Sequence, residues 1–382
     1  MGPTAAMLSG DRLHLQHGPI DLVIGAEGPL AEVKTAYRAA RDRFRTVLPV
    51  LVEELAELRR PVEPGQRFDG PVARRMARAI LRHSHPSAGS NEATESNLQF
   101  SGLTRGPVIK TDVERLDTDP RVKPEGCRFG LDQDDPSTAR GAVFVTPMAA
   151  VAGSVADEVL AAMRSVAPDL QKIWVNNGGD IAIHLSGAAT FEAAMVADPA
   201  TGHEAGRVTL RAGYGIGGIA TSGRHGRSLS LGIADAATVL AKDAAAADVA
   251  ATLIANAVNL PGHPAIRRAP ANEIDPDSDL GERLVVVEVG VLSADEVEEA
   301  LERGLQAAEA MVAKGHVQAA NLTLAGRTLA FHPVAPDDPE DHSVVGSAVH
   351  DRRQHSPRRV SRTPEFASQI GGDNRRRSHA LT

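Results

Sequence analysis

The sequence is poor in cysteine. Its 382 residues include one, Cys127, which excludes an intrachain disulfide framework and any metal site built from several thiolates. A single thiol is typical of a reducing compartment. We therefore expect a cytoplasmic protein held together by hydrophobic packing, with Cys127 as an inert loop thiol.

Aromatic residues are also scarce, at 3% of the chain. Hydrophobic residues make up 42% and charged residues 24%, which are ordinary values for a globular protein. The core must therefore be built from Ala, Val, Leu and Ile, and such side chains favour close packing of helices. The length indicates about two domains, or one large unit with extensions.

The sequence has no membrane-length apolar run and no strongly positive charge. Nowhere do about 18 uncharged apolar residues follow one another, and the N-terminus has no basic segment followed by an apolar one. The formal net charge is -8, which gives no electrostatic reason for nucleic-acid or membrane binding. We expect neither partner for the folded part.

The hydrophobic spacing predicts an α+β fold in which mixed or antiparallel sheets pack against alanine-rich helices. One helix is expected over residues 29–61, kinked or divided at Pro49, and strands lie around 14–25. The rest of the chain is predicted to contain both helices and strands. Further helices are predicted at 71–84, after Val145, at 243–259 and at 293–315, and strands at Val145, 172–176, 180–185, 191–197, 208–211, 236–241, 283–291, 317–324 and 328–331.

Composition divides the chain into four parts. Residues 1–82 form the first part of the main domain, and 141–333 form the rest of it. Between them, residues 83–140 are rich in Ser, Asp, Pro and Gly, which predicts a mobile insertion. Residues 334–382 lack hydrophobic periodicity and become basic, which predicts a disordered tail.

Two alanine-rich helices share a short pattern. The segments "SVADEVLAAM" and "AAADVAATLI" each place an Ala-Asp pair, around Asp157 and Asp248, early in a helix that follows a predicted strand. The pattern favours a duplicated strand-helix unit, although alanine-rich helices also resemble one another by chance.

The segment "WVNNGGDIAIHLSG" joins two predicted strands through an unusually polar turn. A tight hairpin turn needs one permissive dipeptide, whereas Asn176 to Asp180 supply two asparagines, two glycines and an aspartate. The excess indicates that something approaches the backbone here.

Asp248, Thr252 and Asn256 follow one another at intervals of four, so they share one helix face. Asp248 lies one turn beyond the predicted cap Asp243, and we therefore expect it to do something other than helix capping. A carboxylate with a hydroxyl one turn on can bind Mg²⁺. The alternative is a hydrated polar stripe, with Thr252 bonded to a backbone carbonyl.

The glycine-rich segment "GYGIGGIATSGRHGR" has the components of a phosphate site. Its glycines can expose backbone N–H groups, Thr221 and Ser222 add hydroxyls, and Arg224 and Arg227 add positive charge. It matches neither a Walker loop nor a dinucleotide-binding fingerprint. A glycine-rich structural strand is the alternative.

Taken in order, "VNNGGDIAIHLSG", "GIATSGRHGR" and "AATVLAKDAAAADVAATLIANAV" resemble the ApbE superfamily, whose best-known members are Mg²⁺-dependent FAD:protein FMN transferases. The sequence is most similar to an uncharacterised prokaryotic branch. The resemblance covers about residues 11–333 without the segment 83–140.

The resemblance implies specific roles for residues of this chain. Asp248 and Thr252 would bind Mg²⁺. The FAD-binding residues would be Asn176, Asn177, Gly178, Gly179 and Asp180 beside the flavin nucleotide and Thr221, Ser222, Gly223 and Arg224 along its phosphates.

One expected segment is missing. The transferases carry "HxxDP" between the "TSG" region and the strand before the metal helix, and this sequence has "RSLSLGIADAAT" there. Asp235 is the acidic residue nearby and the candidate catalytic base.

The resulting hypothesis is FMN transfer from FAD to a threonine of an acceptor flavoprotein, with release of AMP. Alternatives are a non-catalytic flavin or nucleotide binder and a Mg²⁺-dependent phosphoesterase acting on another metabolite. A homo-oligomer is compatible with each.

Overall fold

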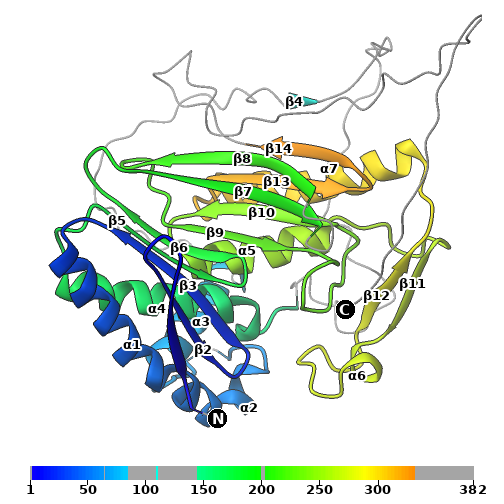
Figure 1. Ribbon diagram of the computed structural model, residues 1–382. Helices are drawn as coiled ribbons and strands as arrows, with labels where there is room; N and C mark the ends of the chain where they lie inside the picture. Colours follow the sequence, from blue (N-terminus) through cyan, green and yellow to red (C-terminus); the bar gives the residue numbers. More distant parts are fainter. Residues whose placement is uncertain (1, 64, 85–108, 111–143, 199–202, 332–382) are drawn as a thin grey trace, which may run out of the picture. The chain divides into compact units, whose positions relative to one another are not determined.

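The computed structural model describes residues 2–63, 65–84, 109–110, 144–198 and 203–331. Within these ranges helices combine with strands that all pair antiparallel, which confirms the α+β class (Figure 1). Most of the predicted insertion at 83–140, including Cys127, and the whole predicted tail at 334–382 lie outside the described residues.

A ten-stranded sheet runs through the described part of the chain in the order β1-β2-β3-β5-β6-β9-β10-β13-β14-β4. Its strands are β1 (Thr4–Leu8), β2 (Arg12–His17), β3 (Ile20–Glu27), β5 (Lys172–Asn177), β6 (Asp180–Leu185), β9 (Gly218–Ser222), β10 (Ala236–Ala241), β13 (Ala319–Leu324), β14 (Arg327–Phe331) and the two-residue β4 (Ile109–Lys110). Two separate ribbons pair β7 (Thr190–Asp198) with β8 (His203–Arg211), and β11 (Ile266–Pro270) with β12 (Leu284–Val289).

Helices cover one face of this sheet. The described helices are α1 (Leu30–Glu53), α2 (Leu55–Leu58), α3 (Pro71–Ser84), α4 (Val151–Val166), α5 (Ala244–Ala257), α6 (Ala271–Ile274) and α7 (Ala294–Ala313), with a short 3-10 helix η2 (Pro147–Ala150), and of these α6 contacts β11 of a separate ribbon. Among these, α4 packs on β5 and β6, α5 on β9 and β10, and α7 on β13. The alanine-rich sequence explains the close approach of α4 and α5, since small side chains let helix backbones come near one another.

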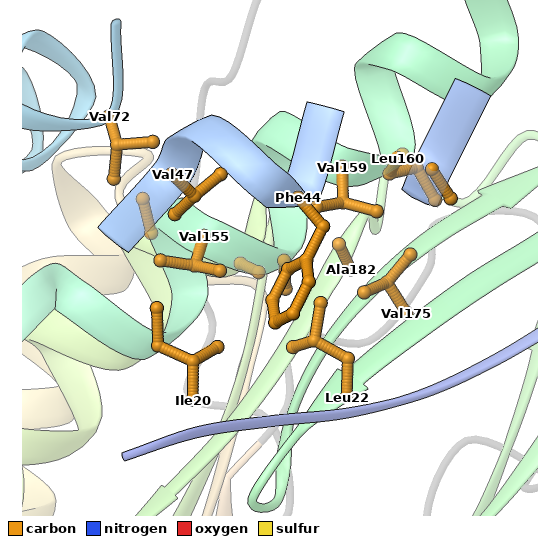
Figure 2. Packing of buried hydrophobic residues seen from close by; sticks show 14 of the residues in the cluster. Ile20, Leu22, Phe44, Val47, Val72, Val155, Val159, Leu160, Val175 and Ala182 are labelled. Atoms are coloured by element: carbon orange, nitrogen blue, oxygen red, sulfur yellow. The ribbon is translucent and has the colours of Figure 1, made fainter. Parts of the chain in front are cut away.

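The core beneath α1 follows from its sequence spacing. Val33, Tyr37, Ala40, Phe44 and Val47 recur on one face, and all five are buried. Figure 2 shows the Phe44 ring among the side chains of α4 and of strands β3, β5 and β6. Burial of such side chains contributes roughly 1.5–3 kcal/mol each.

The centre of the sheet is buried on both faces because side chains alternate along each strand. Ala220 and Val239 point toward α5 and α7, and they belong to the helix-side core. Their neighbours Ile219 and Leu240 pack on the opposite side with Phe191 of the β7–β8 ribbon. This explains why all six residues of β10 are buried.

Several predicted elements differ from the structure. Helix α1 runs through Pro49 to Glu53 instead of dividing there. No strand is formed at residues 144–146, and η2 follows instead, so the predicted strand through Val145 is wrong. The strand half of the proposed duplication is therefore missing before α4 in the described residues. Strands β1 and β11 were not predicted.

The predicted helix starts and ends are otherwise confirmed. Asp243 Oδ1 accepts a hydrogen bond of 2.7 Å from Ala246 N at the start of α5. Helix α7 begins with a capping box between Ser293 and Glu296 and is followed by Gly315 with a φ of 69°. These helix ends can be predicted from the sequence because each cap involves residues within one helical turn.

Candidate functional site

The polar turn between β5 and β6 is a two-residue hairpin. Asn177 pairs with Asp180, and the two central residues, Gly178 and Gly179, have φ angles of 66° and 115°. Left-handed backbone of this kind favours glycine. Asn176 Oδ1 accepts a hydrogen bond of 2.8 Å from Gly179 N, so this asparagine stabilises the turn itself.

Two residues of the turn reach toward other elements. The buried Asn177 donates through Nδ2 to Ala152 O, at 3.1 Å, beside the start of α4. Asp180 Oδ1 accepts from Thr221 N of β9 at 3.3 Å. The turn is therefore fixed against α4 on one side and against the "TSG" segment on the other, which explains polar residues beyond what a hairpin needs.

Asp248 lies at the same junction. Its Oδ2 accepts a hydrogen bond of 2.9 Å from Gly153 N, and the N–H of Ala152 also donates a hydrogen bond to this carboxylate. These amides are in the first turn of α4, where N–H groups lack partners within the helix. Asp248 therefore caps a helix after all, though α4 and not its own helix, and the expectation that it does no capping was wrong.

Asp157 of α4 makes the reciprocal contact. Its Oδ1 accepts a hydrogen bond of 3.1 Å from Ala244 N, and its Oδ2 accepts one of 3.0 Å from Ala245 N. Both amides are in the first turn of α5. The two helices thus cap each other through the two aspartates that the sequence pattern aligned. Gly153 lies where they cross, and a Cβ there would collide with the Ala244 carbonyl.

The carboxylates of Asp180 and Asp248 interact with each other. Burial raises the pKa of Asp180 to about 7, with the Thr221 amide and the Arg227 charge acting in the opposite direction. Burial raises the pKa of Asp248 well above its usual range, and the nearby Asp180 raises it further. Two such carboxylates close together form an electrostatically unfavourable pair that a cation would stabilise.

This pair fits a hard cation. Mg²⁺ takes one or two carboxylates and fills its remaining positions with substrate phosphates and water, so it needs no larger protein cluster. No set of three His, Cys, Asp or Glu side chains suited to a metal occurs in the described ranges. Thr252, partly buried one turn after Asp248 on α5, could supply a further oxygen.

The "TSG" segment is part of a strand. Thr221 and Ser222 end β9 and pair with Thr238 and Ala237 of β10, so the glycine-rich structural strand, held open as the alternative, is the arrangement found. Thr221 Oγ1 lies 2.9 Å from Thr238 Oγ1. Gly223 packs against Asp235, whose carbonyl a Cβ would strike, and this close approach accounts for the glycine.

Arg224 and Asp235 form an ion pair just beyond the strand ends. Arg224 Nη2 lies 2.7 Å and His225 Nε2 lies 3.2 Å from Asp235 Oδ1. Asp235 Oδ2 accepts a hydrogen bond of 2.6 Å from the backbone N of Ala325. These contacts give Asp235 a positioning role between the loop and the β13–β14 turn, and its role as a base stays a prediction.

Arg227 joins the site from the same loop. It is exposed, it is close to Asp180, and a Cβ on Gly178 would collide with its Nη2. The sequence marked Arg227 as a phosphate-binding cation but could not pair it with the distant turn. Its neighbour in sequence, Arg224, is directed to Asp235 instead.

Comparison with known proteins gives the family. A family model described as "AbpE bacteria" matches residues 5–89 and 135–330, which is more than half of the chain. The chain belongs to this family. The matched residues include those of the candidate site described above, from Asn176 to Thr252.

Curated relatives of this ApbE-like chain are archaeal UPF0280 proteins. Identity is 31% over 160 residues with the protein of Methanococcus maripaludis strain C7, covering 40% of this chain and 59% of the relative. It is 39% over 117 residues with the protein of Methanothrix thermoacetophila, covering 30% and 46%. The chain spans about half the length of the curated relatives it matches.

Two solved structures are also similar. They are the ApbE protein of Thermotoga maritima, with a TM-score of 0.39 and 12% identity, and the flavin transferase ApbE from Vibrio cholerae, with 0.35 and 13%. Each match covers 86% of this chain, and 95% and 96% of the other chains. Likeness at this level carries no conclusion about activity.

The described residues contain no helix long and apolar enough to cross a membrane.

Proposed function

We propose that this protein is a Mg²⁺-dependent flavin-nucleotide enzyme that transfers FMN from FAD to a threonine of a protein. The observation that carries the proposal is the meeting of Asp180 and Asp248 beside the first turn of α4. Burial raises the pKa of both carboxylates, and Asp180 raises that of Asp248 further, so a cation bound between them would be stabilised. Arg227 lies at the same turn and would neutralise a phosphate.

The donor groups match a nucleotide pyrophosphate in kind. Asp180, Asp248 and Thr252 would hold the cation, and Arg227 would pair with a phosphate oxygen. Thr221 and Ser222 lie at the same end of β9, and because successive side chains alternate along a strand, Ser222 is the one on the face of α5, where Ala220 also packs. Gly179 has open space at its Cβ position, so a planar ligand can lie against the turn defined by Asn176 and Gly178.

The reaction is a displacement at phosphorus. A threonine hydroxyl of the acceptor attacks the phosphorus on the FMN side, the bond to the bridging oxygen breaks, and AMP leaves with that oxygen. When bound, Mg²⁺ would withdraw charge from the pyrophosphate as a Lewis acid. The hydroxyl proton needs a base, and we propose Asp235, or a carboxylate of the acceptor protein, for this step.

Two further functions use the same groups. A non-catalytic flavin-nucleotide binder would need the cation and phosphate groups without a base, and the engagement of Asp235 by Arg224 and Ala325 favours that alternative. A phosphoesterase would direct water at the same phosphorus. We propose a cytoplasmic location for each, and an acceptor flavoprotein as partner for the transferase.

One experiment separates these functions. The full chain is incubated with FAD and Mg²⁺, with and without candidate acceptor proteins, and AMP release and flavin retained on denatured protein are measured. AMP together with covalent flavin is the expected result. AMP without covalent flavin indicates hydrolysis, and tight FAD binding without AMP indicates a binder.

A further inference from the structure

Basic side chains from three separate parts of the chain meet where α3, α7 and the loop between β10 and α5 come together. His83 lies near the end of α3 and His316 just beyond α7, with ring centroids 4.8 Å apart in an edge-to-face contact. Arg82, Lys242 and Lys314 act electrostatically on these rings. We call these five residues the basic cluster.

The charge of this cluster opposes that of the whole chain, whose formal net charge is -8. Arg82, Lys242 and Lys314 are positively charged at neutral pH. Asp243 Oδ2 lies 3.5 Å from Arg82 Nη1, while Asp243 Oδ1 caps α5. The carboxylate of Asp243 is shared between Arg82 and the cap of α5, so this contact leaves most of the positive charge of the basic cluster uncompensated.

The cluster also contains a buried donor or acceptor without a partner. Nδ1 of His316 makes no hydrogen bond to the described residues, and neither does Oε1 of Gln318, two positions further on. Buried polar atoms are nearly always hydrogen-bonded in folded proteins. An unsatisfied ring nitrogen among three cations is therefore suited to a ligand that accepts hydrogen bonds.

The positive charge of the basic cluster indicates that its ligand is an anion and not a metal cation. The sequence "HSHP" spaces two histidines as some metal sites do, and the structure places His83 next to His316, a second imidazole. Burial and the surrounding cations lower the pKa of both rings, to about 4 for His83. The same cations would repel a divalent metal, whereas neutral imidazoles can still donate N–H groups to an anion.

We propose that the basic cluster binds a phosphate-type dianion, either inorganic phosphate or the phosphomonoester group of a small metabolite. This site does not depend on the proposed nucleotide site. Lys242 follows β10, whereas Thr221 pairs with Thr238, four residues earlier. At about 3.3 Å per residue, roughly 13 Å of strand separates the two positions.

Calorimetric titration of the metal-free full chain with sodium phosphate, at constant ionic strength, tests the proposal. Saturable binding is expected. Lys242→Ala and Lys314→Ala should each weaken it about ten- to a hundredfold, which is typical of losing one charged hydrogen bond. Both lysines are exposed, so folding is preserved. Lys34→Ala, an exposed lysine of α1, is the matched control and should change nothing.

Two additional arms identify the site and the source of the ligand. The pKa values of His83 and His316, followed by proton NMR, should rise when phosphate is added. Glycerol phosphate binding more tightly than inorganic phosphate would assign the site to a metabolite, and equal binding would assign it to free phosphate. The proposal is overturned by absence of saturable binding, by equal weakening in Lys34→Ala, or by unchanged pKa values of His83 and His316 when phosphate is added.

Discussion

The two aspartates that link α4 and α5 do the same structural task in different surroundings. Asp157 caps α5 from inside the core, with a residual exposure of 6%. Asp248 caps α4 from the side where the β5–β6 turn, β9 and Arg227 converge, and it is only partly buried. The comparison separates the two tasks of this pair: Asp157 serves the fold, whereas Asp248 serves the fold and can also contact a ligand.

Removing the buried member should have the largest effect on stability. Asp157→Ala leaves the amides of Ala244 and Ala245 without an acceptor in the core, at a cost of about 2–4 kcal/mol in the free energy of unfolding. Urea unfolding measures this loss. Asp169→Ala, at an exposed position after α4, should cost almost nothing. A similar loss in Asp169→Ala would remove the special role of Asp157.

The crossing point should be nearly as sensitive. Gly153→Ala introduces a Cβ against the Ala244 carbonyl, so the helices must separate and both caps lengthen. We expect a loss of about 1–3 kcal/mol, measured by the same unfolding experiment. Gly2→Ala, with open space around it, is the control. Unchanged stability in Gly153→Ala would show that the helices do not cross this closely.

The buried aspartate also predicts a pH dependence. Burial raises the pKa of Asp157 to about 6, with the Ala245 and Ala244 amides opposing the shift. Because the folded pKa exceeds the ordinary value of 3.8 for an aspartate, the contribution of Asp157 is most favourable at low pH and is lost as pH rises from about 4 to about 6. The stability of the parent relative to Asp157→Asn should therefore decrease across this window. A flat difference between pH 4 and pH 7 would contradict the prediction.

Local features of the fold were predictable from the sequence, and contacts between distant residues were not. The apolar spacing of α1 and the Ser293–Glu296 pair at the start of α7 can both be read from the sequence, since each depends on residues a few positions apart. Strand β9 was left as one of two alternatives, because the reason for its dense glycines, such as the close packing of Gly218 on Asp243, appears only once the partners are known.

The candidate site shows the same limit. The sequence selected the β5–β6 turn, the "TSG" segment and Asp248 separately, and the structure brings all three together. It could not reveal that Asp248 contacts the amides of α4, since those lie 95 residues away. Nor could it distinguish Arg227, directed to the turn, from Arg224, which pairs with Asp235.

Arg227 should have the smallest effect on stability and a clear effect on binding. Arg227→Ala removes an exposed side chain, so the free energy of unfolding should change by less than about 0.5 kcal/mol. Nucleotide affinity should fall about tenfold through the loss of a charged hydrogen bond. Equilibrium dialysis with FAD and Mg²⁺ measures this, with Arg45→Ala on α1 as an exposed control. Equal affinities in both variants would exclude Arg227 from the site.

The difference between Asp157 and Asp248 is tested most directly by calorimetric titration of FAD into the parent, Asp248→Asn and Asp157→Asn, with and without Mg²⁺. The account predicts that the parent and Asp157→Asn bind FAD in a Mg²⁺-dependent manner, and that Asp248→Asn loses the dependence on Mg²⁺ while remaining folded. Unchanged Mg²⁺-dependent binding in Asp248→Asn would contradict it.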